Sequence, residues 1–201
     1  MAVFRGEEVL TGGGLLCYDN SMRQAPPARV GISGKMRSGK DTVARLLAAY
    51  GFQRLAFADR LKELATELFG MSPDEKNRDL LVALGRRMCE LDKDVWVKHV
   101  LARMPTDERI VITDMRFPPE LELLRGAGFY IARVECPERM RLARLSLAGQ
   151  LEHADLMTDP SETALDGRND WDFRLNGATG IVDLTQQVAV MAREMLEGEL
   201  S

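Results

Sequence analysis

The stretch Gly34-Lys-Met-Arg-Ser-Gly-Lys-Asp-Thr42 (GKMRSGKDT) decides the fold of this 201-residue chain. An apolar run at residues 29–33 precedes it, and an amphipathic segment follows it. Gly34 and Gly39 bracket four residues, and Lys40 comes next. A glycine-rich turn between a strand and a helix binds phosphate, because backbone N–H groups and the helix dipole face the anion. The loop therefore predicts a phosphate site with Lys40 on the β- and γ-phosphates; the alternative is a purely structural turn.

The position after Lys40 departs from the usual loop, which has a Ser or Thr hydroxyl there to reach Mg²⁺. This chain has Asp41, and Thr42 follows one residue later. A carboxylate in the first turn suits the helix dipole, but it would repel phosphate unless a metal lay between them. We expect Asp41 to cap or orient, directly or through a metal-bound water, and Thr42 to supply a hydroxyl. The residues expected to hold phosphate and metal here are Gly34, Lys35, Arg37, Ser38, Gly39, Lys40, Asp41 and Thr42.

Outward from the loop, apolar runs typical of buried strands alternate with helical periodicity. The expected strands are residues 29–33, 52–57, 109–113, 129–134 and 171–175. The expected helices are residues 41–50, 59–70, two between 74 and 104, 118–126, one from 137, and 179–197. Residues 149–168 are expected to be irregular. This alternation predicts a three-layer α/β fold, in which a mainly parallel five-stranded sheet has helices on both faces.

Composition limits the class of protein. Hydrophobic residues at 45% and charged residues at 29% are typical of one globular domain. The net charge of −4 argues against a basic face for a nucleic-acid polymer, and the apolar runs are too short to span a membrane. Three widely spaced cysteines, Cys17, Cys89 and Cys136, fit reduced thiols better than disulfides or zinc. With no secretion signal in view, we expect a cytoplasmic protein.

The first 28 residues are rich in Gly and Pro and show no sustained periodicity, so we expect residues 1–28 to be an N-terminal extension. The organised domain is expected at residues 29–201. The sequence leaves open the role of the extension and the oligomeric state, for which a homodimer is one option.

Four segments together resemble the bacteriophage deoxynucleoside monophosphate kinases: SGKMRSGKDT, FADRLKELATELFG, ITDMRFPPELELLR and SETALDGRNDWDFRLNGAT. The resemblance covers residues 29–198. It implies a P-loop kinase fold, ATP with Mg²⁺ as phosphoryl donor, a deoxynucleoside monophosphate as acceptor and, for a phage protein, the host cytoplasm. The Gly-Lys-Asp loop is also similar to that of the animal-type phosphomevalonate kinases. A phosphomevalonate-type or other small-molecule acceptor therefore remains an alternative.

The resemblance places an acceptor-binding part at about residues 58–105. There it implies Lys62 on the acceptor phosphate and Asp59 as a helix cap or a base-recognition residue. Arg60 is near enough to serve instead of Lys62. A solvated surface role is the alternative for both cations, because Lys and Arg on helices usually face water.

Asp114 ends the third predicted strand, and Arg116 lies two residues further on. A carboxylate there could bind Mg²⁺ through water or accept a hydrogen bond from Lys40. Arg116 is similar in position to the arginine that grips the acceptor phosphate in adenylate kinases, and its planar fork suits phosphate oxygens. The alternative is that Asp114 caps the next helix and Arg116 pairs with Glu120.

The resemblance also implies a lid at about residues 138–168. Arg141 and Arg144 are three residues apart and share a helix face with each other, and Arg139 lies nearby. In kinases of this kind, lid arginines neutralise charge on the transferred group; a solvated face is the alternative. His153, also in this segment, is assigned no role.

Two more positions follow from the resemblance. Glu162 of the Ser-Glu pair is an acceptor or lid-closure contact, and Asn176 lies where the adenine of the donor would rest. Phosphoryl transfer is then catalysed by positioning and charge neutralisation, from Lys40, Arg116 and the two lid arginines. A nucleotide-binding regulatory ATPase is the rival from another class. The chain has no Asn-Lys-x-Asp segment, which disfavours a GTPase.

Overall fold

The computed structural model describes residues 26–72 and 77–199. Its centre is a five-stranded sheet in the order β2-β3-β1-β4-β5. All strand pairings in this sheet are parallel, which confirms the predicted α/β architecture. The strands are β1 (Arg29–Gly34), β2 (Phe52–Leu55), β3 (Arg109–Ile112), β4 (Tyr130–Glu135) and β5 (Phe173–Asn176).

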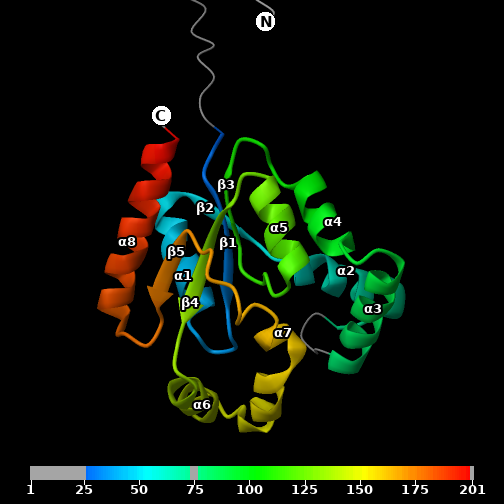
Figure 1. Cartoon of the computed structure of the whole chain (residues 1–201). Coiled ribbons are helices and arrows are strands. Elements are labelled where there is room, and N and C mark those ends of the chain that lie inside the picture. The colour runs from blue at the N-terminus through cyan, green and yellow to red at the C-terminus, as the bar shows by residue number, and fades with distance from the viewer. Residues whose placement is uncertain (1–25, 73–76, 200–201) are drawn as a thin grey trace, which may run out of the picture.

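Helices cover both faces of the sheet (Figure 1). They are α1 (Lys40–Leu47), α2 (Phe57–Phe69), α3 (Arg78–Leu91), α4 (Val95–Arg103), α5 (Pro118–Gly126), α6 (Glu138–Leu147), α7 (Pro160–Thr163) and α8 (Ile181–Gly198). Two short 3₁₀ helices are η1 (Ala48–Tyr50) and η2 (Leu151–Thr158). Residues 149–168 were expected to be irregular, and that is wrong because η2 and α7 lie there. Asp159 starts α7, since its Oδ1 accepts from Ser161 N at 2.8 Å and Pro160 occupies the first turn.

Two hydrophobic clusters fill the layers between sheet and helices. One packs α1 and α8 against the sheet and includes the fully buried Val43, Leu47 and Val188. The other packs α4 and α5 against the opposite face and includes Ile110 and Leu121. Alternate residues of β3 and β4 belong to the two clusters, as expected for a parallel sheet covered on both sides.

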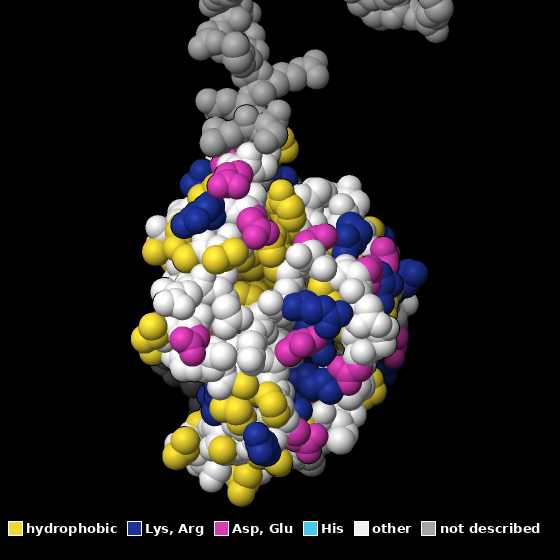
Figure 2. All heavy atoms as spheres, turned by 60° about the vertical axis from the view of Figure 1, so that its left-hand side comes forward, with side chains coloured by type: hydrophobic (Ala, Val, Ile, Leu, Met, Phe, Trp, Pro, Cys, Tyr) yellow, Lys and Arg dark blue, Asp and Glu magenta, His cyan; other side chains and the backbone are white. Residues whose placement is uncertain are grey.

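The carboxyl ends of the parallel strands lie at one end of the sheet, where α6 and α7 are found at the bottom of Figure 1. Loops after β1, β3, β4 and β5 therefore meet there, which is where sheets of this type bind ligands. Apolar side chains gather at this lower end of the face seen in Figure 2, while Lys and Arg are interspersed with Asp and Glu. Leu147 and Ile181 are 89% and 60% exposed.

The start of α2 corrects a prediction about Asp59. The helix begins at Phe57 after Ala56, so Asp59 lies in its first turn and is not the cap. The free amides of Phe57 and Ala58 instead donate to the Asp114 carboxylate, at 2.9 Å each. This pairing across the sheet edge satisfies two of the N–H groups that a helix start leaves open.

Residues 1–25, which contain Cys17 and most of the predicted extension, lie outside the described residues. None of the described helices is both long and apolar enough to span a bilayer.

Candidate active site

The loop between β1 and α1 has the backbone shape of a phosphate cradle. Arg37 and Gly39 have positive φ angles of 61° and 110°, and Ser38 N donates to Lys35 O at 3.0 Å. A Cβ at Gly34 would lie 2.6 Å from Ser38 Oγ, so the loop closes tightly over this glycine. The buried Ser38 Oγ has no hydrogen-bond partner among the described residues. Together with the open amides of the first turn of α1, these features fit a bound phosphate.

A cavity of about 880 Å³ opens beside this loop. The loop and α1 form one wall, while the end of α6 and the turn from β5 to α8 form the other. We call it the donor cavity; its lining residues are Met36, Arg37, Gly39, Lys40, Asp41, Thr42, Arg45, Arg144, Leu147, Ala148, Gly177, Thr179, Ile181 and Leu184. Leu147 and Ile181 give its rim two apolar surfaces, which suit a planar base.

Lys40 is one of the residues that line the donor cavity. Burial lowers the pKa of its ammonium group, and nearby Arg116 lowers it further. Asp41, Glu162 and Asp114 raise the same pKa. Lys40 therefore lies near charged residues of the loop, of the segment after β3 and of α7. Its contact with the β- and γ-phosphates stays a prediction.

Two of the residues predicted to bind the donor lie elsewhere. Lys35 turns away from the donor cavity, and its Nζ lies 2.6 Å from Asp166 Oδ2. Asn176 folds back on its own turn, where its Oδ1 accepts from Ala178 N at 3.0 Å. Gly177 and Thr179 line the cavity in its place. Asp41 and Thr42 do line the cavity, and Thr42 Oγ1 accepts from Arg45 at 3.2 Å.

The two predicted lid arginines have different hydrogen-bond partners and line different cavities. Arg144 reaches the phosphate loop, where its Nη1 donates to Arg37 O at 2.9 Å and to Ser38 O at 3.3 Å. Its Nη2 donates to Gly177 O at 2.7 Å, so Arg144 clamps the loop to the end of β5. Arg141 is 3% exposed, donates to Cys136 O at 3.2 Å and lines a different cavity. The shared helix face that the spacing predicts does not bring both guanidinium groups to the donor cavity.

A second cavity, of about 720 Å³, lies between α2, α3 and α5, and we call it the acceptor cavity. Its apolar lining residues are Phe57, Ala58, Leu61, Leu81, Val82, Gly85, Cys89, Trp96, Val97, Phe117, Pro118 and Pro119, and its polar ones are Arg78, Arg86, Lys93, Asp114, Arg116, Glu120 and Ser161. It is therefore mainly apolar with several cationic groups. Phe57 and Trp96 line it, whereas Phe69 is 58% exposed and is not among the lining residues.

Arg116 joins the acceptor cavity to the phosphate loop. Its Nη1 donates to Glu162 Oε1 at 3.0 Å and to Ser161 Oγ at 3.2 Å. Glu162 Oε2 accepts from Met36 N in the loop. The alternative pairing of Arg116 with Glu120 is wrong for the side chain, because Glu120 accepts from the backbone N–H groups of Arg116 and Phe117 at 2.6 and 2.9 Å.

Two carboxylates, those of Asp114 and Glu120, line the acceptor cavity. Burial raises the pKa of both, and hydrogen bonds from backbone amides partly offset the rise. The pKa of Glu120 reaches about 7, to which the nearby Asp114 contributes. Within the described part of the chain no three His, Cys, Asp or Glu side chains cluster as a metal site would require. The predicted metal set of Asp41, Thr42 and Asp114 contains only two carboxylates, so it is not a cluster of this kind and stays a prediction.

Glu120 carries a prediction about stability. Its raised pKa means that the folded state holds the proton more tightly than the unfolded state, so stability is full below pH ~4.5 and falls as pH rises through ~7. Replacing Glu120 with Gln removes this loss. We expect the variant to match the natural protein at pH 4.5 and to exceed its unfolding free energy by about 3 kcal/mol at pH 8.5.

Urea denaturation of both proteins at the two pH values measures this difference. Glu122→Gln is the matched control on the same helix, because Glu122 is exposed and pairs with Arg168 at 2.7 Å. Equal stability of the Glu120→Gln variant and the natural protein at pH 8.5 would show that Glu120 ionises without a folding penalty.

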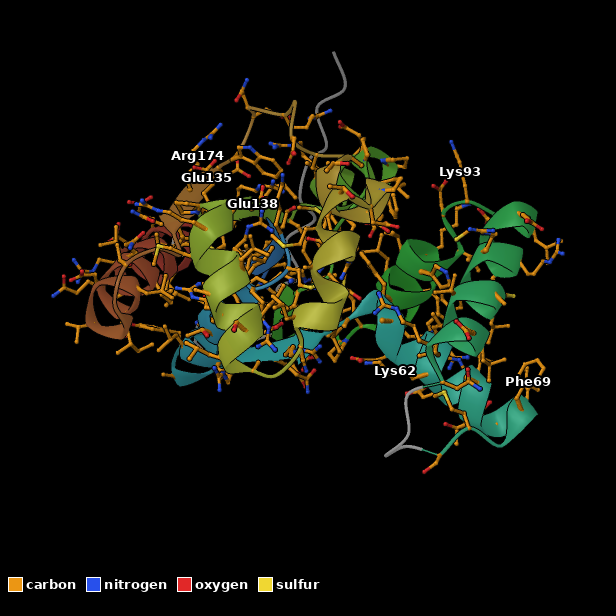
Figure 3. The ribbon with its side chains drawn as sticks, turned by 90° about the horizontal axis from the view of Figure 1, so that it is seen from below. Lys62, Phe69, Lys93, Glu135, Glu138 and Arg174 are labelled. Carbon is orange, nitrogen blue, oxygen red and sulfur yellow. The ribbon has the colours of Figure 1, made fainter. Side chains whose placement is uncertain are left out.

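The acceptor-side residues that the resemblance implies are not among those that line this cavity. Lys62 Nζ is 3.3 Å from Asp59 Oδ1, and Asp59 also lies 3.3 Å from Arg54. Arg60 pairs with Glu63 and Glu67, each at 3.0 Å, along the surface of α2. Figure 3 looks at the carboxyl ends of the strands and shows Lys62 well apart from Lys93, which lines the cavity. The side chain of His153 lies outside the described residues.

Sequence reasoning missed the cations of α3 and its following turn, Arg78, Arg86 and Lys93. None of the three has an ion-pair partner within the described residues, and all three line the acceptor cavity. The signal was present in the sequence for Arg78, because Leu81, Gly85 and Cys89 follow it by three, seven and eleven positions and so lie on the same helix face. Only the packing of α3 over α2 shows that this face borders a cavity.

Comparisons with known proteins agree with this architecture. A gluconokinase from Sinorhizobium meliloti 1021 superimposes with a TM-score of 0.58 at 16% identity, covering 86% of this chain and 95% of that chain. A shikimate kinase from Acinetobacter baumannii, in complex with shikimate, gives 0.54 at 16% identity over 87% of this chain and 96% of that chain. At such identities the likeness shows a shared fold, which is the P-loop kinase fold.

Two comparisons concern the sequence itself. The uncharacterized protein ORF77 of Ictalurid herpesvirus 1 (strain Auburn) is 31% identical over 156 residues, which cover 74% of this chain. The chain spans less than two thirds, 63%, of that relative. The family model described as "AAA domain" matches residues 30–164, which include the phosphate loop, the acceptor cavity and α7. Since that match takes in well over half of the sequence, the chain belongs to the AAA domain family.

Proposed function

We propose that this protein is a deoxynucleoside monophosphate kinase, which transfers the γ-phosphoryl group of ATP to the phosphate of the acceptor. The observation that carries the proposal is that Lys40 of the donor cavity lies near enough to Arg116 of the acceptor cavity for their charges to interact, and that Arg116 pairs with Glu162. A binding switch needs one nucleotide cavity, whereas two cavities that converge on the end of a phosphate loop suit transfer between two ligands.

The lining of the acceptor cavity favours a nucleotide over a sugar acid. Trp96, Phe57 and Phe117 offer apolar surface for a planar base, and Arg116 with Arg78 offers guanidinium groups for a phosphate. Small polyhydroxylated acceptors leave such apolar surface uncovered and need many hydrogen-bonding groups instead. The kinases with gluconate- and shikimate-related names share the fold, and this lining supports a different acceptor here.

The donor cavity supports ATP and Mg²⁺. The loop amides and Lys40 would bind the β- and γ-phosphates, and Leu147 and Ile181 would pack on the adenine. Thr42 and Asp41 would hold Mg²⁺, directly or through water, and the metal would neutralise charge that develops during transfer. Asp114 would then act mainly by fixing the start of α2, since both of its oxygens accept backbone N–H groups.

The proposed function divides the chain into a kinase domain and two functional parts within it. Residues 29–201 form the kinase domain, with an acceptor-binding part at about 58–105 and a lid at about 138–168. Within the lid, Arg144 would keep the phosphate loop in its shape, because its guanidinium group donates to the backbone carbonyl oxygens of Arg37 and Gly177. Water exclusion by such a lid would favour transfer to the acceptor over hydrolysis.

ADP release from ATP and Mg²⁺, measured with a panel of acceptors, tests the proposal. We expect at least one of dAMP, dCMP, dGMP and dTMP to raise ADP release more than tenfold above the rate with ATP alone. Ribonucleoside monophosphates, phosphomevalonate, gluconate and shikimate complete the panel as competing acceptors. If phosphomevalonate or a sugar acid were the best acceptor, the nucleotide assignment would be wrong while the kinase assignment stood.

One outcome of the same panel would favour the rival class. Slow ADP release that no acceptor accelerates would point to a nucleotide-binding regulatory ATPase. The second cavity argues against a regulatory ATPase. A nucleotide switch needs no apolar, cation-lined cavity in addition to its nucleotide site.

A further inference from the structure

Glu162 is the most buried carboxylate in the candidate site and lies between its two halves. Its side chain is 2% exposed, although it sits on the four-residue helix α7 at the surface edge of the sheet. One oxygen accepts from Arg116 Nη1 at 3.0 Å, and the other accepts from the backbone N–H of Met36. A single carboxylate thus joins the acceptor arginine to the phosphate loop.

Only one nitrogen of the Arg116 guanidinium group makes these hydrogen bonds. Arg116 Nη1 is bound to Glu162 and Ser161, while no described group accepts from its Nη2 or Nε. The side chain is 39% exposed and lines the acceptor cavity. Glu162 therefore fixes one corner of the guanidinium fork and leaves the rest available to an incoming anion.

The segment that carries Glu162 is itself anchored. Asp166 accepts from Lys35 Nζ at 2.6 Å and from Arg133 Nη2 at 2.9 Å, and Arg133 Nη1 donates to Ser33 Oγ at 2.9 Å. These contacts tie the chain after α7 to the carboxyl end of β1 and the start of the phosphate loop. A carboxylate on so constrained a segment can hold a fixed geometry, which a carboxylate on a free loop cannot.

We propose that Glu162 is a positioning residue, which sets the distance between the acceptor held by Arg116 and the γ-phosphate held by the loop. The proposal rests on the proposed kinase function. In-line transfer requires the attacking oxygen and phosphorus at about 3–3.5 Å, and a misplacement of about 1 Å can cost about 10²-fold in rate. Glu162 acts through Arg116 and Met36 and touches neither reactant.

Glu162→Gln is the sharpest variant. Gln has nearly the same shape, but its amide offers one acceptor oxygen and one donor group to two facing N–H donors. In one of the two contacts, the amide NH₂ of Gln would therefore face another N–H donor. We expect kcat to fall about 100-fold, with the KM for the acceptor and the KM for ATP each within threefold of the natural values, because both binding surfaces remain.

A double-mutant cycle with Arg116→Ala separates positioning from general damage. If Glu162 acts through Arg116, Glu162→Gln in the Arg116→Ala background should lower kcat by less than fivefold. Glu122→Gln is the matched charge-neutralising control and should leave kcat unchanged. Thermal unfolding of every variant shows whether it is folded, and Glu162→Asp, which withdraws the carboxylate by one methylene, carries the same cycle if the Gln variant does not fold.

Two results would overturn the assignment: a kcat for Glu162→Gln within threefold of the natural value, or an equal loss in both backgrounds. Failure of the proposed function looks different, because then the natural protein itself would phosphorylate no acceptor. An increase in acceptor KM without a change in kcat would also reject positioning, since it would mean that Glu162 contributes only to binding.

Discussion

Replacing Lys40 with Met is expected to lower kcat for ADP formation by about 10³-fold. Met is close to Lys in length and removes the ammonium charge, so the cavity keeps its shape. Lys40 stands among Asp41, Asp114 and Glu162, whose charges raise its pKa. Without the ammonium group these carboxylates would repel the donor phosphates, and the charge that develops in transfer would lose a buried counter-charge, a loss of about 3–4 kcal/mol.

The assay compares steady-state ADP release of the natural protein, Lys40→Met and Lys98→Met. Lys98 is a suitable control because it pairs with Asp92 at 2.8 Å on the outer surface of α4, away from both cavities. Similar melting temperatures for the three proteins would show that the effect concerns the site. A Lys40→Met variant that keeps more than a tenth of the natural kcat would exclude a central role for the loop lysine.

Much of the fold could be predicted from the sequence because its signals are local. The loop at residues 34–42 needs only its own glycines and its flanking strand and helix to be identified. The helix at residues 118–126 was predicted with the bounds that the structure has, since Pro118 and the apolar spacing mark it. Alternation of strands and helices then implied a parallel sheet, which the pairing of β1 with β3 and β4 confirms.

The partners of the charged residues could not be predicted in the same way. Asp114 accepts from Phe57 N, 57 residues earlier in the chain, and Glu162 accepts from Met36 N, 126 residues earlier. Such contacts depend on which strand ends lie side by side, and helix spacing carries no information about that. The resemblance likewise implied Lys62 at an acceptor, because a motif identifies a helix but not the element that packs on each of its faces.

Gly177 illustrates the same limit, because its importance depends on a contact with the other end of the domain. A Cβ built on this residue would lie 1.9 Å from the carbonyl oxygen of Ser38 and 3.0 Å from Val134 Cγ1. The backbone of the phosphate loop therefore passes directly against the backbone that follows β5. Gly177 N donates to Glu135 O at 2.7 Å, and Arg144 binds its carbonyl oxygen, which leaves the glycine little freedom to move away.

Gly177→Ala is expected to lower the unfolding free energy by about 3 kcal/mol, the upper part of the usual range for overpacking, because the obstructing atom is backbone and cannot rotate aside. The shift of Ser38 should also disturb the loop amides and weaken ATP binding at least tenfold. Urea denaturation and calorimetric titration of ATP measure the two effects.

Gly126→Ala is the matched control, since nothing lies within 4 Å of a Cβ at that helical position. Alanine there should be neutral or stabilise by up to about 1 kcal/mol. If Gly177→Ala behaved like Gly126→Ala in both measurements, the close approach of the two backbones would not exist in solution. The donor cavity would then lack the wall that the turn after β5 provides, and the placement of the adenine beside Ile181 would fall with it.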